Sequence, residues 1–169
     1  MWRSLSKRMS LAATVALTAA LAVFPGPAGA ADRITITLPA GVACSFELQV
    51  DIVSGDHRVN RTFVDANGNP VRILEAGFGN QLTFTNTSTG STIALPANGS
   101  VSQTVMNADG SQTVTLSGHN VLILFPSDVP AGPSTTLYVG RVVFTVDLHQ
   151  VFTLVSTSGT ARDICAGLS

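Results

Sequence analysis

Apolar and polar side chains alternate along much of the chain beyond residue 30. Five segments show this pattern, with threonine, glutamine or a charged residue between the apolar positions: 33–38, 46–52, 81–85, 113–116 and 141–148. Successive side chains of a β-strand point to opposite faces of its sheet, so each segment predicts a strand with one apolar and one polar face. Half-buried strands of this kind are typical of antiparallel sheets.

Glycine-containing turn signals separate the predicted strands. They are Asn67-Gly68, Asn98-Gly99, Asp109-Gly110, Ser117-Gly118 and Ser158-Gly159, together with the stretch 86–90. Asn-Gly and Asp-Gly supply the positive φ angles that tight hairpins require. The sequence therefore predicts an all-β fold, an antiparallel meander of about ten strands closed as a β-barrel or a tight β-sandwich. The sequence does not choose between the two, although closure as a barrel would remove exposed strand edges.

One predicted strand departs from the alternation. Val121, Leu122, Ile123, Leu124 and Phe125 are apolar at every position, so both faces of this segment should be covered. The simpler explanation is a central strand packed on two sides. The alternative is that one face lines a ligand cavity or a subunit contact. The proline-rich loop 126–133 follows directly and is a candidate rim for such a site.

The N-terminal segment has the organisation of a secretory signal peptide. Arg3, Lys7 and Arg8 precede an apolar run over 11–24, and Ala28-Gly29-Ala30 supplies the small residues of a cleavage site. A membrane anchor is the alternative, but this run is shorter than the roughly 20 residues that a spanning helix needs. We predict cleavage after Ala30 and Sec export. Residues 31–169 then form a single secreted, extracellular domain without a transmembrane anchor.

Cleavage makes the chain more acidic. It removes three of the nine basic residues and none of the ten acidic ones, so the formal charge falls from −1 to −4. Six arginines are left and they are scattered along the sequence. Nucleic-acid binding requires a cationic stripe that displaces counterions, and this composition argues against it.

Cys44 and Cys165 are the only cysteines, so only one pairing within the chain exists. A disulfide is the default state in an oxidising compartment, and two buried free thiols are the alternative. No histidine lies within a few residues of either cysteine, which disfavours zinc. A bond requires Cα atoms within about 4.4–6.8 Å. It would therefore make the first and last long strands neighbours and close the sheet.

The residues suited to acid–base chemistry are few. The histidines are His57, His119 and His149, and the aspartates that could orient them are Asp56, Asp128 and Asp147. Asp147 and His149 fall on one side of a predicted strand, but that side also carries Arg141 and Thr145 and is expected to be a solvated face. We assign no catalytic residue, metal or cofactor, and we do not expect an enzyme.

The segment 65–69 imitates the start of a calcium loop. Pro70 then stands where an EF-hand needs glycine, and Ala76 stands where it needs glutamate. The segment is therefore predicted to be a hairpin turn that needs no ion.

Together, the signal peptide ending Ala28-Gly29-Ala30, the entry Cys44-Ser45-Phe46-Glu47-Leu48, the threonine-rich strands and the closing Asp163-Ile164-Cys165-Ala166 resemble small, uncharacterised secreted β-rich proteins of actinobacteria. The resemblance implies an exported β-domain and carries over no activity or site. The leading interpretation is a non-catalytic structural or interaction module, extracellular or surface-associated, whose partner is unknown. A β-barrel carrier of an apolar small molecule is the alternative. A hydrolase is third.

Overall fold

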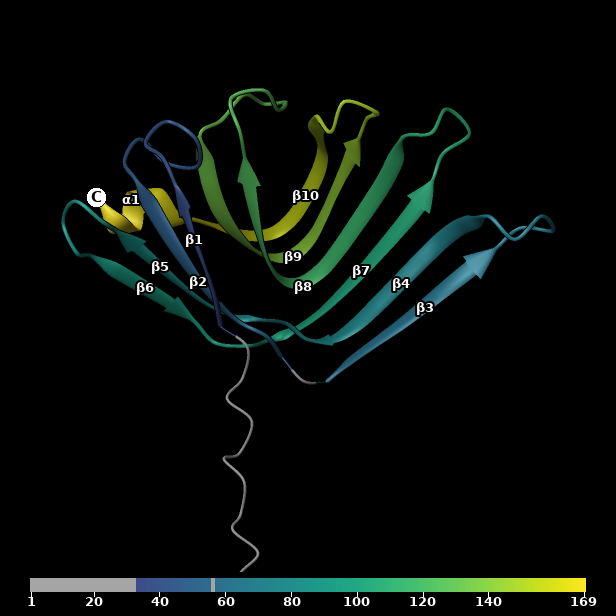
Figure 1. Ribbon diagram of the computed structural model, residues 1–169, viewed down its shortest axis with the longest axis horizontal. Helices are drawn as coiled ribbons and strands as arrows, with labels where there is room; N and C mark the ends of the chain where they lie inside the picture. The colour runs from purple at the N-terminus through teal and green to yellow at the C-terminus, as the bar shows by residue number, and fades with distance from the viewer. Residues whose placement is uncertain (1–32, 56) are drawn as a thin grey trace, which may run out of the picture. The chain divides into compact units, whose positions relative to one another are not determined.

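The computed structural model describes residues 33–55 and 57–169, so the predicted signal peptide lies outside the described residues. The described part contains ten β-strands and one short helix (Figure 1). The elements are β1 (Arg33–Leu38), β2 (Leu48–Val53), β3 (Arg58–Val64), β4 (Pro70–Phe78), β5 (Gln81–Asn86), β6 (Thr92–Leu95), β7 (Gly99–Met106), β8 (Gln112–Leu124), β9 (Ser134–Val146), β10 (Phe152–Asp163) and α1 (Ile164–Leu168).

The strands form two antiparallel sheets, which confirms the all-β prediction. The four-stranded sheet has the order β1-β2-β5-β6, and the six-stranded sheet has the order β10-β9-β8-β7-β4-β3. The chain passes between the sheets three times, from β2 to β3, from β4 to β5 and from β6 to β7. The arrangement is sandwich-like. Of the two architectures that the sequence left open, the closed barrel is wrong, because each sheet ends in free edge strands. The predicted simple meander is interrupted where β4 pairs with β7.

A row of glycines bends the six-stranded sheet. Strand pairing aligns one residue from each strand in a single row across the sheet, in the order Arg58, Gly77, Ser100, Gly118, Gly140, Gly159. All four glycines have positive φ, and a Cβ on any of them would clash with a backbone carbonyl oxygen. Glycine at such positions allows a sharp bend and close backbone approach. The sheet curves here, as β8, β9 and β10 show in Figure 1.

This glycine row corrects two turn predictions. Gly118 and Gly159 lie inside β8 and β10 rather than in hairpin turns. Their positive φ is real, with values of 94° and 93°, but it serves the bend of a continuous strand. A serine-glycine pair in the sequence does not by itself show whether the glycine forms a hairpin turn or bends a continuous strand.

A hydrophobic core fills the inside of the bend. Its buried side chains come from both sides of the glycine row and share one sheet face, here called the inner face. They are Val114, Val142, Phe144 and Val146 on one side and Leu122 and Leu124 on the other. The sheet therefore folds over its own apolar face.

The loop 126–133 ties the two arms of the bend together. Asp128 is buried, and its carboxylate accepts hydrogen bonds from the backbone N–H of Phe125 at 2.6 Å and of Phe152 at 3.0 Å. The backbone of Val129 bonds to Phe152 O at 2.8 Å and to Leu154 N at 2.7 Å. The end of β8 is thus fastened to the start of β10.

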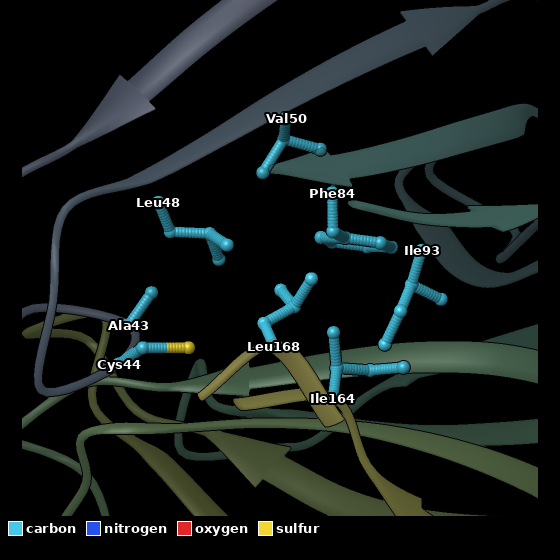
Figure 2. Close-up of a cluster of buried hydrophobic side chains, with 8 residues drawn as sticks. All are labelled: Ala43, Cys44, Leu48, Val50, Phe84, Ile93, Ile164 and Leu168. Atoms are coloured by element: carbon cyan, nitrogen blue, oxygen red, sulfur yellow. The ribbon is translucent and has the colours of Figure 1, made fainter. Parts of the chain in front are cut away.

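A second core lies between the sheets. Leu48, Val50, Phe84 and Ile93 of the four-stranded sheet meet Ile164 and Leu168 of α1 (Figure 2). Val121 and Ile123 pack against this core, whereas Leu122 and Leu124 belong to the core inside the bend. The expectation that both faces of this strand are covered is confirmed.

The disulfide is present, but it does not join strands. Cys44 and Cys165 are bonded, with a Cα–Cα distance of 5.6 Å. Cys44 lies in the β1–β2 loop and Cys165 lies in α1, whose first turn is capped by Asp163 Oδ1 accepting from Ala166 N at 3.0 Å. β10 pairs only with β9, and β2 pairs with β1 and β5. The predicted adjacency of the first and last strands is wrong, because the chain leaves β10 as a helix that packs between the sheets.

Replacing Cys44 and Cys165 together by serine is expected to lower the free energy of unfolding by roughly 2–5 kcal/mol, because the crosslink restricts the unfolded chain across a long loop. The bond spans a sequence separation of 121. Denaturant titration of the two proteins measures the change, and far-ultraviolet circular dichroism should show unchanged strand content. A double variant as stable as the parent would contradict this role.

Gly140→Ala is expected to destabilise the fold by about 1–3 kcal/mol or more, because the new Cβ meets Ser158 O and the residue has a φ of 144°. Gly99→Ala is the matched control, since Gly99 lies in β7 with nothing near the position of its added Cβ. Thermal and denaturant unfolding compare the two. Equal losses would show that the glycine row does not require glycine.

Candidate functional site

The three histidines are not brought together. His119 lies in β8 and His57 lies next to β3, so β4 and β7 separate them within the six-stranded sheet. His149 lies in the β9–β10 turn. Of the aspartates considered with them, Asp128 already accepts hydrogen bonds from the backbone N–H groups of Phe125 and Phe152. Asp56 lies outside the described residues.

Asp147 and His149 are not on a strand, contrary to the prediction. β9 ends at Val146, and Asp147 Oδ1 accepts hydrogen bonds from His149 N at 2.8 Å and Val151 N at 2.9 Å. The carboxylate thereby builds a turn. It holds the backbone of His149, not its imidazole ring.

Three hairpins of the six-stranded sheet share this construction. In the loops 65–69, 107–111 and 147–151, the first residue's N–H donates to the fifth residue's carbonyl at 2.9, 2.8 and 3.1 Å. The fourth residue has positive φ and is Gly68, Gly110 or Gln150. The Asn-Gly and Asp-Gly signals found the first two, and the third was missed because its fourth residue is glutamine.

The calcium-like loop uses its carboxylate internally. Asp65 Oδ1 accepts from Asn67 N at 2.8 Å and from Asn69 N at 2.9 Å. The Asn69 amide is the largest cause of a pKa of Asp65 below the ordinary value of 3.8, and the Ser111 hydroxyl lowers the pKa of Asp109 in the same way. Within residues 33–55 and 57–169, no three His, Cys, Asp or Glu side chains gather as a metal site.

A hollow forms where the six-stranded sheet divides. Pairing of β7 with β8 ends at Ser100–Gly118, whereas β8 and β9 stay paired up to Leu124–Ser134. The segment joining β6 to β7 diverges from β8 at this point. The resulting crease hollow has a volume of about 260 Å³ and is lined by Arg58, Gly79, Asn80, Leu82, Leu95, Pro96, Asn98, Ser100, His119, Asn120, Val121 and Leu137.

The crease hollow is lined by both apolar and polar residues. Arg58 Nη2 donates to Asn80 Oδ1 at 2.9 Å, and Asn120 Nδ2 is buried without a hydrogen-bond partner. Of the segment predicted as a candidate cavity wall, Val121 lines the hollow, while Leu122 and Leu124 lie in the other core. The hollow is smaller than the roughly 300–1,000 Å³ of typical ligand pockets, so it fits only a small group.

The opposite side of the six-stranded sheet, here called the outer face, carries a cationic cluster. Phe63 lies between two arginines: the guanidinium carbon of Arg72 is 4.0 Å from its ring centroid and that of Arg61 is 5.9 Å away. Strand pairing places Arg141 on the same face. All three arginines are exposed.

The outer face carries no opposing charge on its strands. The only acidic residues within the six strands are Glu75 and Asp163, and strand pairing places both on the inner face. Among the described residues, no carboxylate is bonded to Arg61, Arg72 or Arg141. The arginines are scattered in sequence, but the register places Arg61, Arg72 and Arg141 on one face, and Arg162 has the same register beyond the glycine row. Composition alone did not reveal this.

Exposed apolar side chains lie beside the glycine row on the same outer face. Val59, Phe78 and Val101 have exposed fractions of 70%, 55% and 42%. Val59 and Val101 both pair with Ala76, and Phe78 pairs with Gly99 on the other side of the glycine row. These three residues are here called the crest. Phe78 and Val101 line a shallow depression together with His57, Ser117 and Gly118.

Comparison with protein-family models, curated proteins and solved structures finds no match for this chain. The resemblance to secreted actinobacterial proteins stays a prediction. No helix within the described residues is long and apolar enough to cross a membrane.

The carboxyl groups of Asp65 and Asp109 are expected to titrate below 3.8 in the folded protein, because their pKa values are lowered by hydrogen bonds that the unfolded chain lacks. Protonation of these carboxylates therefore destabilises the folded hairpins. Their contribution to stability is complete above the unfolded pKa and is lost as the pH falls through the lower folded pKa. Carboxyl-carbon NMR titration measures both midpoints. Values at or above 3.8 would show that these hydrogen bonds do not form.

Proposed function

We propose that this chain is an exported, non-catalytic binding module that contacts an anionic partner through the outer face of its six-stranded sheet. The observation that carries the proposal is the cluster of Arg61, Phe63 and Arg72, in which two exposed guanidinium groups lie over one ring and bond no carboxylate within the described part of the chain.

The chemistry of this cluster favours anions. A guanidinium presents its N–H groups in a planar array that matches phosphate and carboxylate oxygens in pairs. The Phe63 ring holds the Arg72 group at 4.0 Å, so less side-chain freedom is lost when an anion binds. The chain as a whole has a formal charge of −1, which makes the purely cationic strand surface of the outer face a local exception.

Two further features support an extracellular site of action. The N-terminal sequence has the pattern of a cleavable signal, and the Cys44–Cys165 disulfide suits an oxidising compartment.

A second candidate function concerns the crease hollow. Its apolar lining residues and the unpartnered side-chain amide of Asn120 favour a small ligand with one polar end. This would be a carrier role without a barrel, and the small volume of the hollow makes it the less favoured of the two.

The double substitution Arg61→Gln and Arg72→Gln is expected to weaken binding to inorganic polyphosphate about tenfold or more. A plot of log affinity against log salt concentration should also become less steep. By analogy with single- and double-stranded nucleic acids, its slope should fall by about 0.7–0.9 for each phosphate that is no longer neutralised. Isothermal titration at several salt concentrations measures both. Arg33→Gln in β1 of the other sheet is the charge-matched control for each single substitution, Arg61→Gln and Arg72→Gln, because each removes one positive charge. The proposal fails if the parent does not bind polyphosphate, or if Arg33→Gln weakens binding as strongly as the other two single substitutions.

A further inference from the structure

The crest gives the outer face a second chemical character. Val59 and Val101 flank Ala76 on the outer face, and Phe78 lies two residues along β4 from Ala76, so the three exposed side chains share one face. A hydrophilic polyanion bound to the arginines would leave them in water. A contiguous exposed apolar patch marks a contact with another apolar surface. The partner should therefore offer apolar groups as well as negative charge.

The crest lies on the convex side of the bend. It lies next to the glycine row, on the outside of the curve formed by the two arms of the sheet. The four-stranded sheet covers the outer face on the far arm, where Val121, Ile123 and Leu137 pack against its core. The side chains of the crest stay exposed, so a partner surface can reach them.

The arginines flank the crest at short range. Arg61 follows Val59 by two residues along β3, about 7 Å, and Arg141 lies in the same row as Val101, two strand spacings or about 10 Å away. Apolar tips surrounded by guanidinium groups suit the boundary between acyl chains and phosphate headgroups. Negative surface charge on such a layer attracts clustered arginines.

We propose that the crest and the flanking Arg61, Arg72 and Arg141 bind the surface of an anionic phospholipid layer, with the crest side chains entering the headgroup region and the guanidinium groups bonding lipid phosphates. This inference rests on the proposed function and names its partner. The arginines favour an anionic partner because their charge is complementary. The exposed apolar crest favours a lipid layer over a soluble polyanion, because a lipid layer also offers apolar groups.

Vesicle cosedimentation tests the proposal with the chain beginning at Ala31. The parent is expected to bind vesicles of phosphatidylglycerol mixed with phosphatidylcholine and not vesicles of phosphatidylcholine alone. The triple substitution Val59→Ser, Phe78→Ser and Val101→Ser should weaken vesicle binding about tenfold or more while leaving polyphosphate binding unchanged. The matched control is Leu148→Ser with Val155→Ser, which removes apolar side chains with exposed fractions of 70% and 59% away from the crest.

The outcomes separate this inference from the proposed function. Binding to polyphosphate without binding to anionic vesicles overturns the lipid surface and leaves the proposed function intact. Equal vesicle binding by the crest variant and the parent, or equal binding to neutral and anionic vesicles, also overturns it. A parent that sediments as a dimer, becomes a monomer on crest substitution and ignores vesicles would show that a second copy covers the crest. If the parent binds neither polyphosphate nor anionic vesicles, both proposals are overturned.

Discussion

The bend along the glycine row is the constraint on which the rest of the structure depends. Four strands place a positive-φ glycine in one row, where a side chain would collide with a neighbouring carbonyl. This bend lets one sheet enclose a core on its inner face and still pack its outer face against the four-stranded sheet. It also places the crest on the convex side of the sheet, where its side chains are exposed.

Two ties hold the arms and layers in this position. Asp128 fastens the end of β8 to the start of β10 through two backbone amides, and a buried carboxylate satisfied in this way stabilises without needing a basic partner. The Cys44–Cys165 bond secures α1 against the β1–β2 loop. Nearby, Thr135 Oγ1 donates to Ala43 O at 3.0 Å, which links that loop to β9. The C-terminal helix and the β1–β2 loop are thus anchored although the sheets stay open.

The outer face shows how strand register creates a surface property that composition hides. Arg61 and Arg72 lie on the two strands of one hairpin and meet at the Phe63 ring, because β3 and β4 pair with Phe63 opposite Arg72. The acidic residues of the same sheet have the opposite register or lie in hairpin loops, where Asp65, Asp109 and Asp147 bond their own backbone. A chain of net negative charge therefore presents a cationic strand surface.

The sequence by itself determined the class of the fold, most strand positions, the disulfide pairing and the hairpins at Gly68 and Gly110, because alternation and turn chemistry are local properties. It could not decide between closure and an open pair of sheets, since that depends on whether the positive φ of Gly118 and Gly159 serves a turn or a bend. It could not place Cys165 in a helix, because five residues are too few for a helical period to emerge. The crest and the cationic cluster required the register between strands. Only the tertiary structure fixes that register, since it is set by packing between residues far apart in the chain.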